Sequence, residues 1–236
     1  MVSIFSTRLS RWEEEEPTSR GMVMPEALFR AGVALSLAWG WPLFAAALLL
    51  GFNGLLRRGE VLGLLRCELI LTCDLLSCRQ VAFVRVQCSK TSRFMLRQHA
   101  KIRMLSLFAF FPRSSQTNRL RLSLFACSPA VFRRRWDEVF SFLHVPTAEV
   151  NLGVTPKSLR GSRATWLYQE TEDIERIQWG GRWQQRRTLE HYLQDVAGQL
   201  LLASLTKSQR LHVSELSAFA EPLLSTYIEL VPSAHS

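Results

Sequence analysis

Two arginines and one tyrosine of this chain have the residue types needed to cut a phosphodiester bond. Arg57 lies in the sequence GLLRRGE, Arg160 ends the sequence TPKSLR, and Tyr192 follows a histidine. Cleavage without a metal needs a nucleophile, positive charge near the non-bridging oxygens and an acid for the leaving oxygen. A guanidinium donates two parallel hydrogen bonds to phosphate oxygens, and a tyrosine hydroxyl can form a covalent intermediate. Taken singly, each arginine is equally typical of the end of an apolar or amphipathic helix.

The spacing of these residues is more specific than their types. Arg160 precedes Trp183 by 23 positions and Tyr192 by 32. The set resembles the catalytic residues of the tyrosine recombinases (the phage integrase family), and of their Cre-like members in particular. The resemblance implies that Arg57 and Arg160 clamp the phosphate, with Glu60 supporting the neighbourhood of Arg57. It also implies that the Trp183 indole donates to a phosphate oxygen and that Tyr192 forms a 3′-phosphotyrosyl intermediate.

The resemblance assigns roles to lysines as well. The family's general acid is a lysine in a turn between two strands, and Lys90, in the sequence SKTS, occupies such an expected turn. Lys101 in the following strand is the alternative, and an ordinary solvated hairpin lysine would fit either position. A lysine can protonate a leaving alkoxide where desolvation and neighbouring cations lower its pKa. Lys157 stands where the family has the histidine of its H-x-x-R box; a lysine there can donate to phosphate but, while protonated, cannot serve as a base.

The composition is compatible with a polyanionic partner. The chain has 236 residues, with 29 Lys and Arg against 20 Asp and Glu, and a formal charge of +9. Such a balance is typical of proteins that face phosphates or membranes, although a solvated basic surface without a partner would give the same numbers. The five cysteines include no C-x-x-C pair, so we expect buried thiols in a reducing compartment rather than a zinc site or a disulfide framework.

An uncharged run from Ala31 to Leu56 competes with the recombinase interpretation. Its length would allow it to span a bilayer. Gly40 and Pro42 interrupt it, however, and two tryptophans lie in its middle rather than at its ends, where interfacial aromatics belong. We therefore favour two buried helices, which would also carry Arg57 into a site, over a membrane-associated helical protein.

The remaining pattern predicts a mainly helical chain with one small sheet. Proline after a capping residue marks a helix start, and alternating apolar residues mark strands. On these signals we expect helices from Pro25, from Pro42 and over 57–65, 130–143, 172–179, 185–196 and 214–230, with a helix carrying Arg160 that begins at Thr155-Pro156. Strands are expected over 69–73, 81–87 and 94–103, with a turn at 89–92.

The resemblance implies an α+β fold, mainly α-helical with a small antiparallel three-stranded sheet. We expect a loose arm over residues 1–20 and a recombinase-like catalytic domain over 21–236, without the family's N-terminal core-binding domain. Double-stranded DNA is the implied partner, with self-association on DNA through the helix at 214–230, no cofactor, no metal and no membrane. The implied location is intracellular and DNA-associated. A catalytically inactive basic DNA-binding remnant of the same fold is the alternative, which the lysine at 157 favours.

Overall fold

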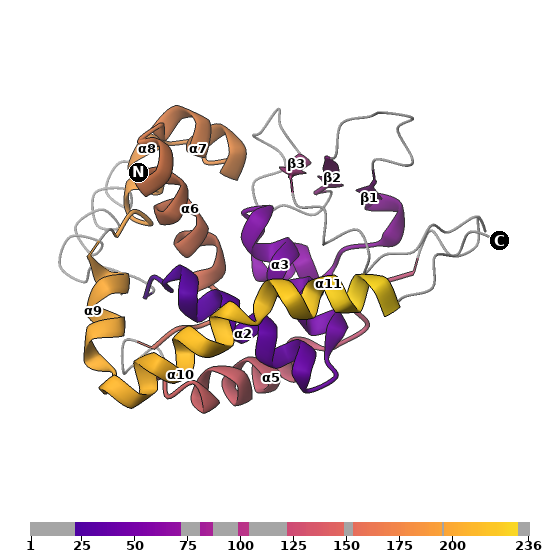
Figure 1. Cartoon of the computed structure of the whole chain (residues 1–236). Helices are drawn as coiled ribbons and strands as arrows, with labels where there is room; N and C mark the ends of the chain where they lie inside the picture. Colours follow the sequence, from indigo (N-terminus) through magenta and orange to yellow (C-terminus); the bar gives the residue numbers. More distant parts are fainter. Residues whose placement is uncertain are drawn as a thin grey trace, which may run out of the picture.

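Two apolar helices, α2 (Glu26–Ala38) and α3 (Pro42–Asn53), occupy the centre of the molecule (Figure 1). The computed structural model describes residues 22–71, 81–86, 99–103, 122–148, 153–194 and 196–230. Pro25 precedes α2 and Pro42 is the first residue of α3, as expected of a residue that lacks the amide hydrogen a helix interior needs. Between them Gly40 has a φ of 72°, a left-handed conformation that favours glycine and reverses the chain.

The uncharged run is therefore divided into two helices that are largely buried, joined by an exposed turn. Residues 44–52 of α3 are buried, and Leu48 and Leu50 are fully enclosed. Phe29 of α2 stacks on Phe52 of α3 with ring centroids 3.9 Å apart. In the part of the chain that the structure describes, no helix is both long and apolar enough to cross a membrane.

A three-stranded antiparallel sheet lies beside the C-terminal end of α3, in the order β1 (Leu69–Ile70), β2 (Ala82–Arg85), β3 (His99–Ile102). The short helix α4 (Arg58–Leu62) and one 3₁₀ turn over Arg66–Glu68 lead into it from α3. Alternate residues of β2 and β3 are buried against the core, whereas Lys101, which pairs with Phe83, is exposed. The expected fold class, mainly helical with a small antiparallel sheet, is confirmed.

The C-terminal half is helical, as predicted. Its elements are α5 (Pro129–Phe142), α6 (Ser158–Thr171), α7 (Ile174–Gly181), α8 (Arg186–Glu190), α9 (Ala197–Ser204), α10 (Lys207–Ala218) and α11 (Ala220–Leu230). Helix α5 starts as predicted, with Ser128 as its N-cap and Pro129 as its first residue. The Ser128 hydroxyl accepts a hydrogen bond from the Val131 amide. Trp136 of α5 is fully buried and donates its indole N–H to the Val154 carbonyl.

Several expected boundaries are wrong: the helix expected over 57–65 spans 58–62, and the one expected over 172–179 spans 174–181. Three larger differences have a visible cause or divide a helix. Helix α6 begins at Ser158 rather than at Thr155, because the Thr155 amide donates to the Ser158 hydroxyl in a turn that precedes the helix. The helix expected over 185–196 ends at Glu190, and α9 follows as a separate helix. The segment 214–230 contains the end of α10 and all of α11, which meet at Phe219.

Both C-terminal helices pack against α2 of their own chain (Figure 1). Ala220 and Leu224 of α11 are buried there, while Leu230 is 74% exposed. Self-association through this segment stays a prediction. The expected arm over 1–20, the expected turn at 89–92 and Lys90 within it lie outside the described residues.

Candidate active site

The start of α4 and three segments of the C-terminal half meet around the guanidinium of Arg160. Arg160 is the third residue of α6, Arg57 immediately precedes α4, Trp183 follows the end of α7, and Tyr192 follows α8. The Arg160 Cζ lies 4.2 Å from the centre of the Trp183 ring, and the rings of Trp183 and Tyr192 are 5.4 Å apart. Burial lowers the pKa of Arg160 and the positive charge of Arg57 adds to this, so the two guanidinium groups lie near each other. The four residues singled out by spacing are thus neighbours.

The position of Arg160 is unfavourable for a charge. Its side chain is 4% exposed; one terminal nitrogen donates to the Gly181 carbonyl, and its Nε has no hydrogen-bond partner among the described residues. Burial lowers the pKa of Arg160, and the positive charges of Arg57 and Arg182 add to this, bringing it to about 9 although Glu60 acts in the opposite direction. An anion placed beside Arg160 would relieve this repulsion.

Glu60 holds two arginines at the edge of this site. Its carboxylate, 4% exposed, accepts from the Arg57 amide at 2.8 Å and from the Arg57 guanidinium at 3.1 Å. The same carboxylate accepts from the buried guanidinium of Arg182 at 2.8 Å. Since charged hydrogen bonds of this kind are short and directional, Glu60 fixes the start of α4 against the end of α7.

Arg182 was missed by the sequence analysis, although it lies in the GGRW stretch that contains Trp183. It is the C-cap residue of α7, with a left-handed φ of 61°. Its guanidinium also donates to the Leu55 carbonyl at 3.4 Å. The signal that could have indicated it is a lone arginine between a glycine pair and a tryptophan, because a left-handed turn directs that side chain back into the fold.

Two glycines allow the aromatic rings to approach. A Cβ at Gly181 would lie 1.6 Å from the Trp183 ring, far inside van der Waals contact. A Cβ at Gly161, next to Arg160, would lie 3.1 Å from the Tyr192 ring. The Trp183 ring therefore occupies the space above Gly181, between the guanidinium of Arg160 and the ring of Tyr192.

Gly181→Ala should destabilise the fold by about 2 kcal/mol, the typical cost of overpacking a core, because the buried Trp183 ring must move. Gly59→Ala in α4 is the matched control, since a Cβ added there would meet no atom within 4 Å and the φ of Gly59 is not positive; it should stabilise by about 0.5 kcal/mol. Urea unfolding followed by circular dichroism measures both. Equal effects of the two substitutions would show that Trp183 is loosely held.

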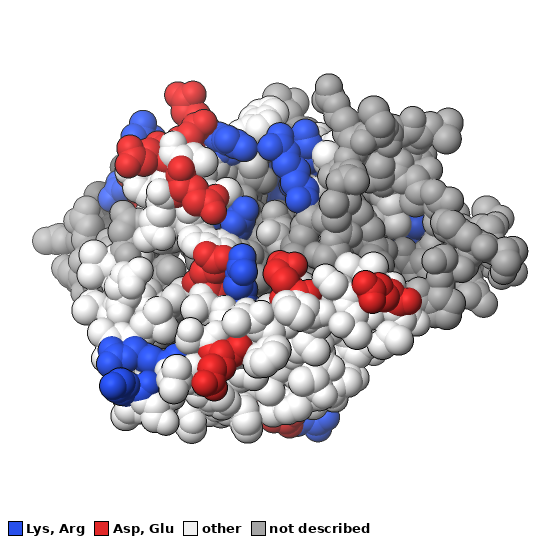
Figure 2. Space-filling view, viewed as in Figure 1, with Lys and Arg blue, Asp and Glu red and all other residues white. Residues whose placement is uncertain are grey.

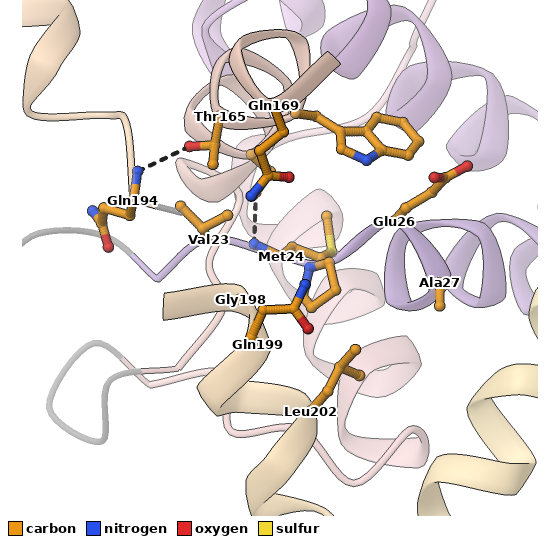
Figure 3. A pocket seen from close by; sticks show the side chains of 13 residues that line it. Val23, Met24, Glu26, Ala27, Thr165, Gln169, Gln194, Gly198, Gln199 and Leu202 are labelled. Carbon is orange, nitrogen blue, oxygen red and sulfur yellow. Dashed lines mark hydrogen bonds between the residues drawn. The ribbon is translucent and has the colours of Figure 1, made fainter. Parts of the chain in front are cut away.

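The backbone around Tyr192 is held by a buried hydroxyl of α6. Thr165 donates from its Oγ1 to the Tyr192 carbonyl at 2.8 Å and accepts from the Gln194 amide at 3.2 Å. Figure 3 shows this second bond at the edge of a pocket between the chain before α2, helix α6 and helix α9. These bonds replace helical ones, which explains why the helix of Arg186–Glu190 does not continue through Tyr192.

The lysines are placed less centrally. Lys157 is exposed at the N-cap position of α6, whereas Arg160, one turn later, is buried. Lys101 is exposed on β3, and Lys90 lies outside the described residues. Among the described residues no group of three or more His, Cys, Asp or Glu side chains could hold a metal ion. The expectation of buried thiols is wrong for Cys67, which is exposed.

No protein-family model matches this chain, and no curated protein gives a significant match. The chemistry of the site is therefore argued from its residues. Three guanidinium groups and one carboxylate, with a tyrosine beside them, give a net positive site that suits an anion and holds one side chain able to act as a nucleophile.

Proposed function

We propose that this protein breaks and rejoins DNA strands through a phosphotyrosine at Tyr192, as the tyrosine recombinases that it resembles do. The observation that carries the proposal is the meeting of Arg57, Arg160, Trp183 and Tyr192, which come from four separate segments. A structural arginine would have its charge neutralised by a buried carboxylate. Arg160 instead is buried beside two further cations, an arrangement that suits a phosphate.

In the proposed site the phosphate enters past Arg57. The Arg57 side chain is 38% exposed, whereas those of Arg182 and Glu60 are 3% and 4% exposed. A phosphate bound by Arg57 and Arg160 would accept hydrogen bonds on its two non-bridging oxygens. Because Arg160 is buried in this structure, we propose that the segment carrying Tyr192 moves outward as DNA binds.

The reaction then follows from the bond that forms and the bond that breaks. The hydroxyl oxygen of Tyr192 attacks phosphorus and loses its proton, and the 5′ oxygen of the next nucleotide leaves and gains one. The arginines stabilise the negative charge that builds on the non-bridging oxygens. Lys90, or alternatively Lys101, is the proposed acid for the leaving oxygen. Attack of a 5′ hydroxyl on the phosphotyrosine reverses the step and rejoins a strand.

The substrate of this proposal is double-stranded DNA bound mainly through its backbone. With a formal charge of +9, the chain should bind more weakly as salt rises, because neutralised phosphates release counterions. A second candidate, an inactive DNA-binding protein with the same site, is favoured by the exposed Lys157, which occupies the position of the histidine in the resembled family.

The decisive experiment uses a labelled duplex with a nick beside each candidate cleavage position, so that the short released strand diffuses away and traps the covalent product. A library of random duplex sequences removes the need to know the target. Incubation in EDTA and analysis on a denaturing gel should give a protein–DNA adduct, since the arginines supply the charge that a metal would otherwise supply. Binding without an adduct at any sequence would favour the inactive candidate.

A further inference from the structure

A second basic site adjoins the first. A groove of about 350 Å³ is formed by the C-terminal end of α3, the end of β3, one face of α6 and helix α7. Four cations and one tryptophan line it: Lys101, Arg103, Arg163, Arg176 and Trp179. We call this the β3–α7 groove. Figure 2 shows lysine and arginine side chains gathered in the upper centre of the molecule, where Figure 1 places β3 and α7.

The cations of the groove do not form the ion pairs with described residues that some other surface arginines form. Elsewhere, four arginines pair with a carboxylate one turn away in their own helix: Arg30, Arg133, Arg134 and Arg186. No such ion pair joins any of the four groove cations to a described residue, and no described Asp or Glu lines the groove. A concave surface with this charge attracts a polyanion.

Arg163 is held in the groove by aromatic rings. Its Cζ lies 5.6 Å from the centre of the Phe52 ring and 5.2 Å from that of Trp166, and its buried Nε has no hydrogen-bond partner among the described residues. Burial lowers the pKa of Arg163, although Glu170 acts in the opposite direction. A guanidinium positioned by cation–π contacts places a fixed positive charge beside the groove, where an anion can bind.

The occupant is indicated by Trp179, which is 65% exposed in a groove whose charged lining residues are all cations among the described residues. Duplex DNA cannot offer a base face to such a ring because its bases are already stacked. Unpaired bases can stack on an exposed aromatic ring while their phosphates contact nearby cations. We propose that the β3–α7 groove binds single-stranded DNA, with a base on Trp179 and the backbone along the four cations.

The groove and the Arg160 site share their dividing wall. Leu55 and Gly180 line the groove, while the Leu55 carbonyl accepts from Arg182 and the Gly181 carbonyl accepts from Arg160. If the Arg160 site cuts DNA, the groove is positioned to hold the strand that cleavage frees. The binding itself does not depend on cleavage, and it is tested separately.

Fluorescence anisotropy of a short labelled oligothymidylate and of a duplex of equal length tests the proposal, with the full chain carrying Tyr192→Phe so that no covalent product forms. Trp179→Ala should weaken oligothymidylate binding about tenfold, in line with the loss of one base–aromatic stack, and should leave duplex binding unchanged within about twofold. Trp179→Phe should retain most of the affinity and Trp179→Leu should not, because leucine keeps apolar bulk but offers no flat ring.

The cations are tested as a pair. Arg103→Gln with Arg176→Gln should lower the slope of log K against log salt for the oligothymidylate by about 1.4, since each single-strand phosphate contact contributes about 0.7. Lys207→Gln with Arg210→Gln removes the same charge from exposed positions of α10 and should change the slope little. Melting curves show whether each variant remains folded.

Three results would overturn the inference. Trp179→Ala could weaken duplex and oligothymidylate equally, which would make the groove a general backbone contact. Trp179→Ala could also leave the binding of both the duplex and the oligothymidylate unchanged, which would show that no base stacks on Trp179. Inorganic phosphate could compete for the groove with no dependence on Trp179, which would make it a simple phosphate site. A wild-type chain that forms no adduct but binds oligothymidylate through Trp179 would reject strand transfer and retain the groove.

Discussion

Replacing Tyr192 by phenylalanine should abolish the covalent adduct with nicked DNA and leave DNA binding unchanged. The substitution removes one oxygen, and the ring that lies 5.4 Å from Trp183 and against Gly161 remains. The bonds that Thr165 makes to the backbone at Tyr192 and Gln194 do not involve the tyrosine hydroxyl. The fold and the cationic surface should therefore survive while the nucleophile is lost.

Tyr168→Phe is the matched control. Tyr168 lies on α6, eight residues after Arg160, and packs, as Tyr192 does, against the small apolar cluster that contains Leu55 and Leu189. Removing its hydroxyl should leave adduct formation at the wild-type level. The measurement is a denaturing gel of labelled nicked DNA, with anisotropy of an intact duplex run in parallel. An adduct that persists in Tyr192→Phe and disappears in Tyr168→Phe would reassign the nucleophile.

Local chemistry made much of the fold predictable. Proline at the starts of α2, α3 and α5 removes a donor that a helix interior needs, so those starts could be placed from sequence. Buried residues alternate with more exposed ones along the strands β2 and β3. This alternation can be recognised from the sequence, because every second residue of a strand faces the core. Where signals were local and unopposed, the prediction and the structure agree.

Tertiary bonds explain the boundaries that could not be predicted. The segment after α8 has a helical pattern, yet Thr165, which lies 27 residues before Tyr192, takes hydrogen bonds that a continuing helix would need. The turn before α6 likewise depends on the Ser158 hydroxyl bonding back to the Thr155 amide. No window of sequence around Tyr192 contains Thr165, so propensity alone favours the longer helix.

In the candidate site, too, some residues could be predicted from the sequence and one could not. Spacing singled out Arg57, Arg160, Trp183 and Tyr192, and the structure brings them together. Arg182 was overlooked because its role depends on a left-handed turn and on Glu60, 122 residues away in sequence. A residue whose partner is distant can be recognised only when the fold supplies the partner.

The two buried arginines should respond differently to the same substitution. Arg182→Met should lower the free energy of unfolding by about 3 kcal/mol, because it removes one partner of a buried ion pair. Glu60 would retain Arg57, whose side chain is far more exposed than that of Arg182. Arg160→Met should leave the free energy of unfolding unchanged or raise it, since no carboxylate forms an ion pair with Arg160 among the described residues and two cations repel it.

Three effects set the result for Arg160→Met, and the first is the loss of the cation–π contact with Trp183, worth about 0.5–2 kcal/mol. The lost hydrogen bond leaves the Gly181 carbonyl without this donor, at a cost of about 1–3 kcal/mol. Removing the buried charge of Arg160 stabilises the fold by several kcal/mol, because the desolvation of that charge no longer has to be offset. Methionine preserves the unbranched shape of the side chain, so Trp183 keeps a neighbour above its ring.

Cleavage separates the two roles further. If Arg160 stabilises the transition state, Arg160→Met should reduce the rate of adduct formation by about 10²–10³-fold, as the loss of one oxyanion donor does, while duplex affinity falls much less. Urea unfolding and single-turnover adduct formation on the same two variants provide the comparison. If Arg160→Met folds stably but no longer cleaves DNA, then Arg160 serves to bind an anion and lowers the stability of the fold. If Arg160→Met instead unfolds as easily as Arg182→Met, Arg160 is part of the scaffold, and the phosphate clamp must be sought elsewhere.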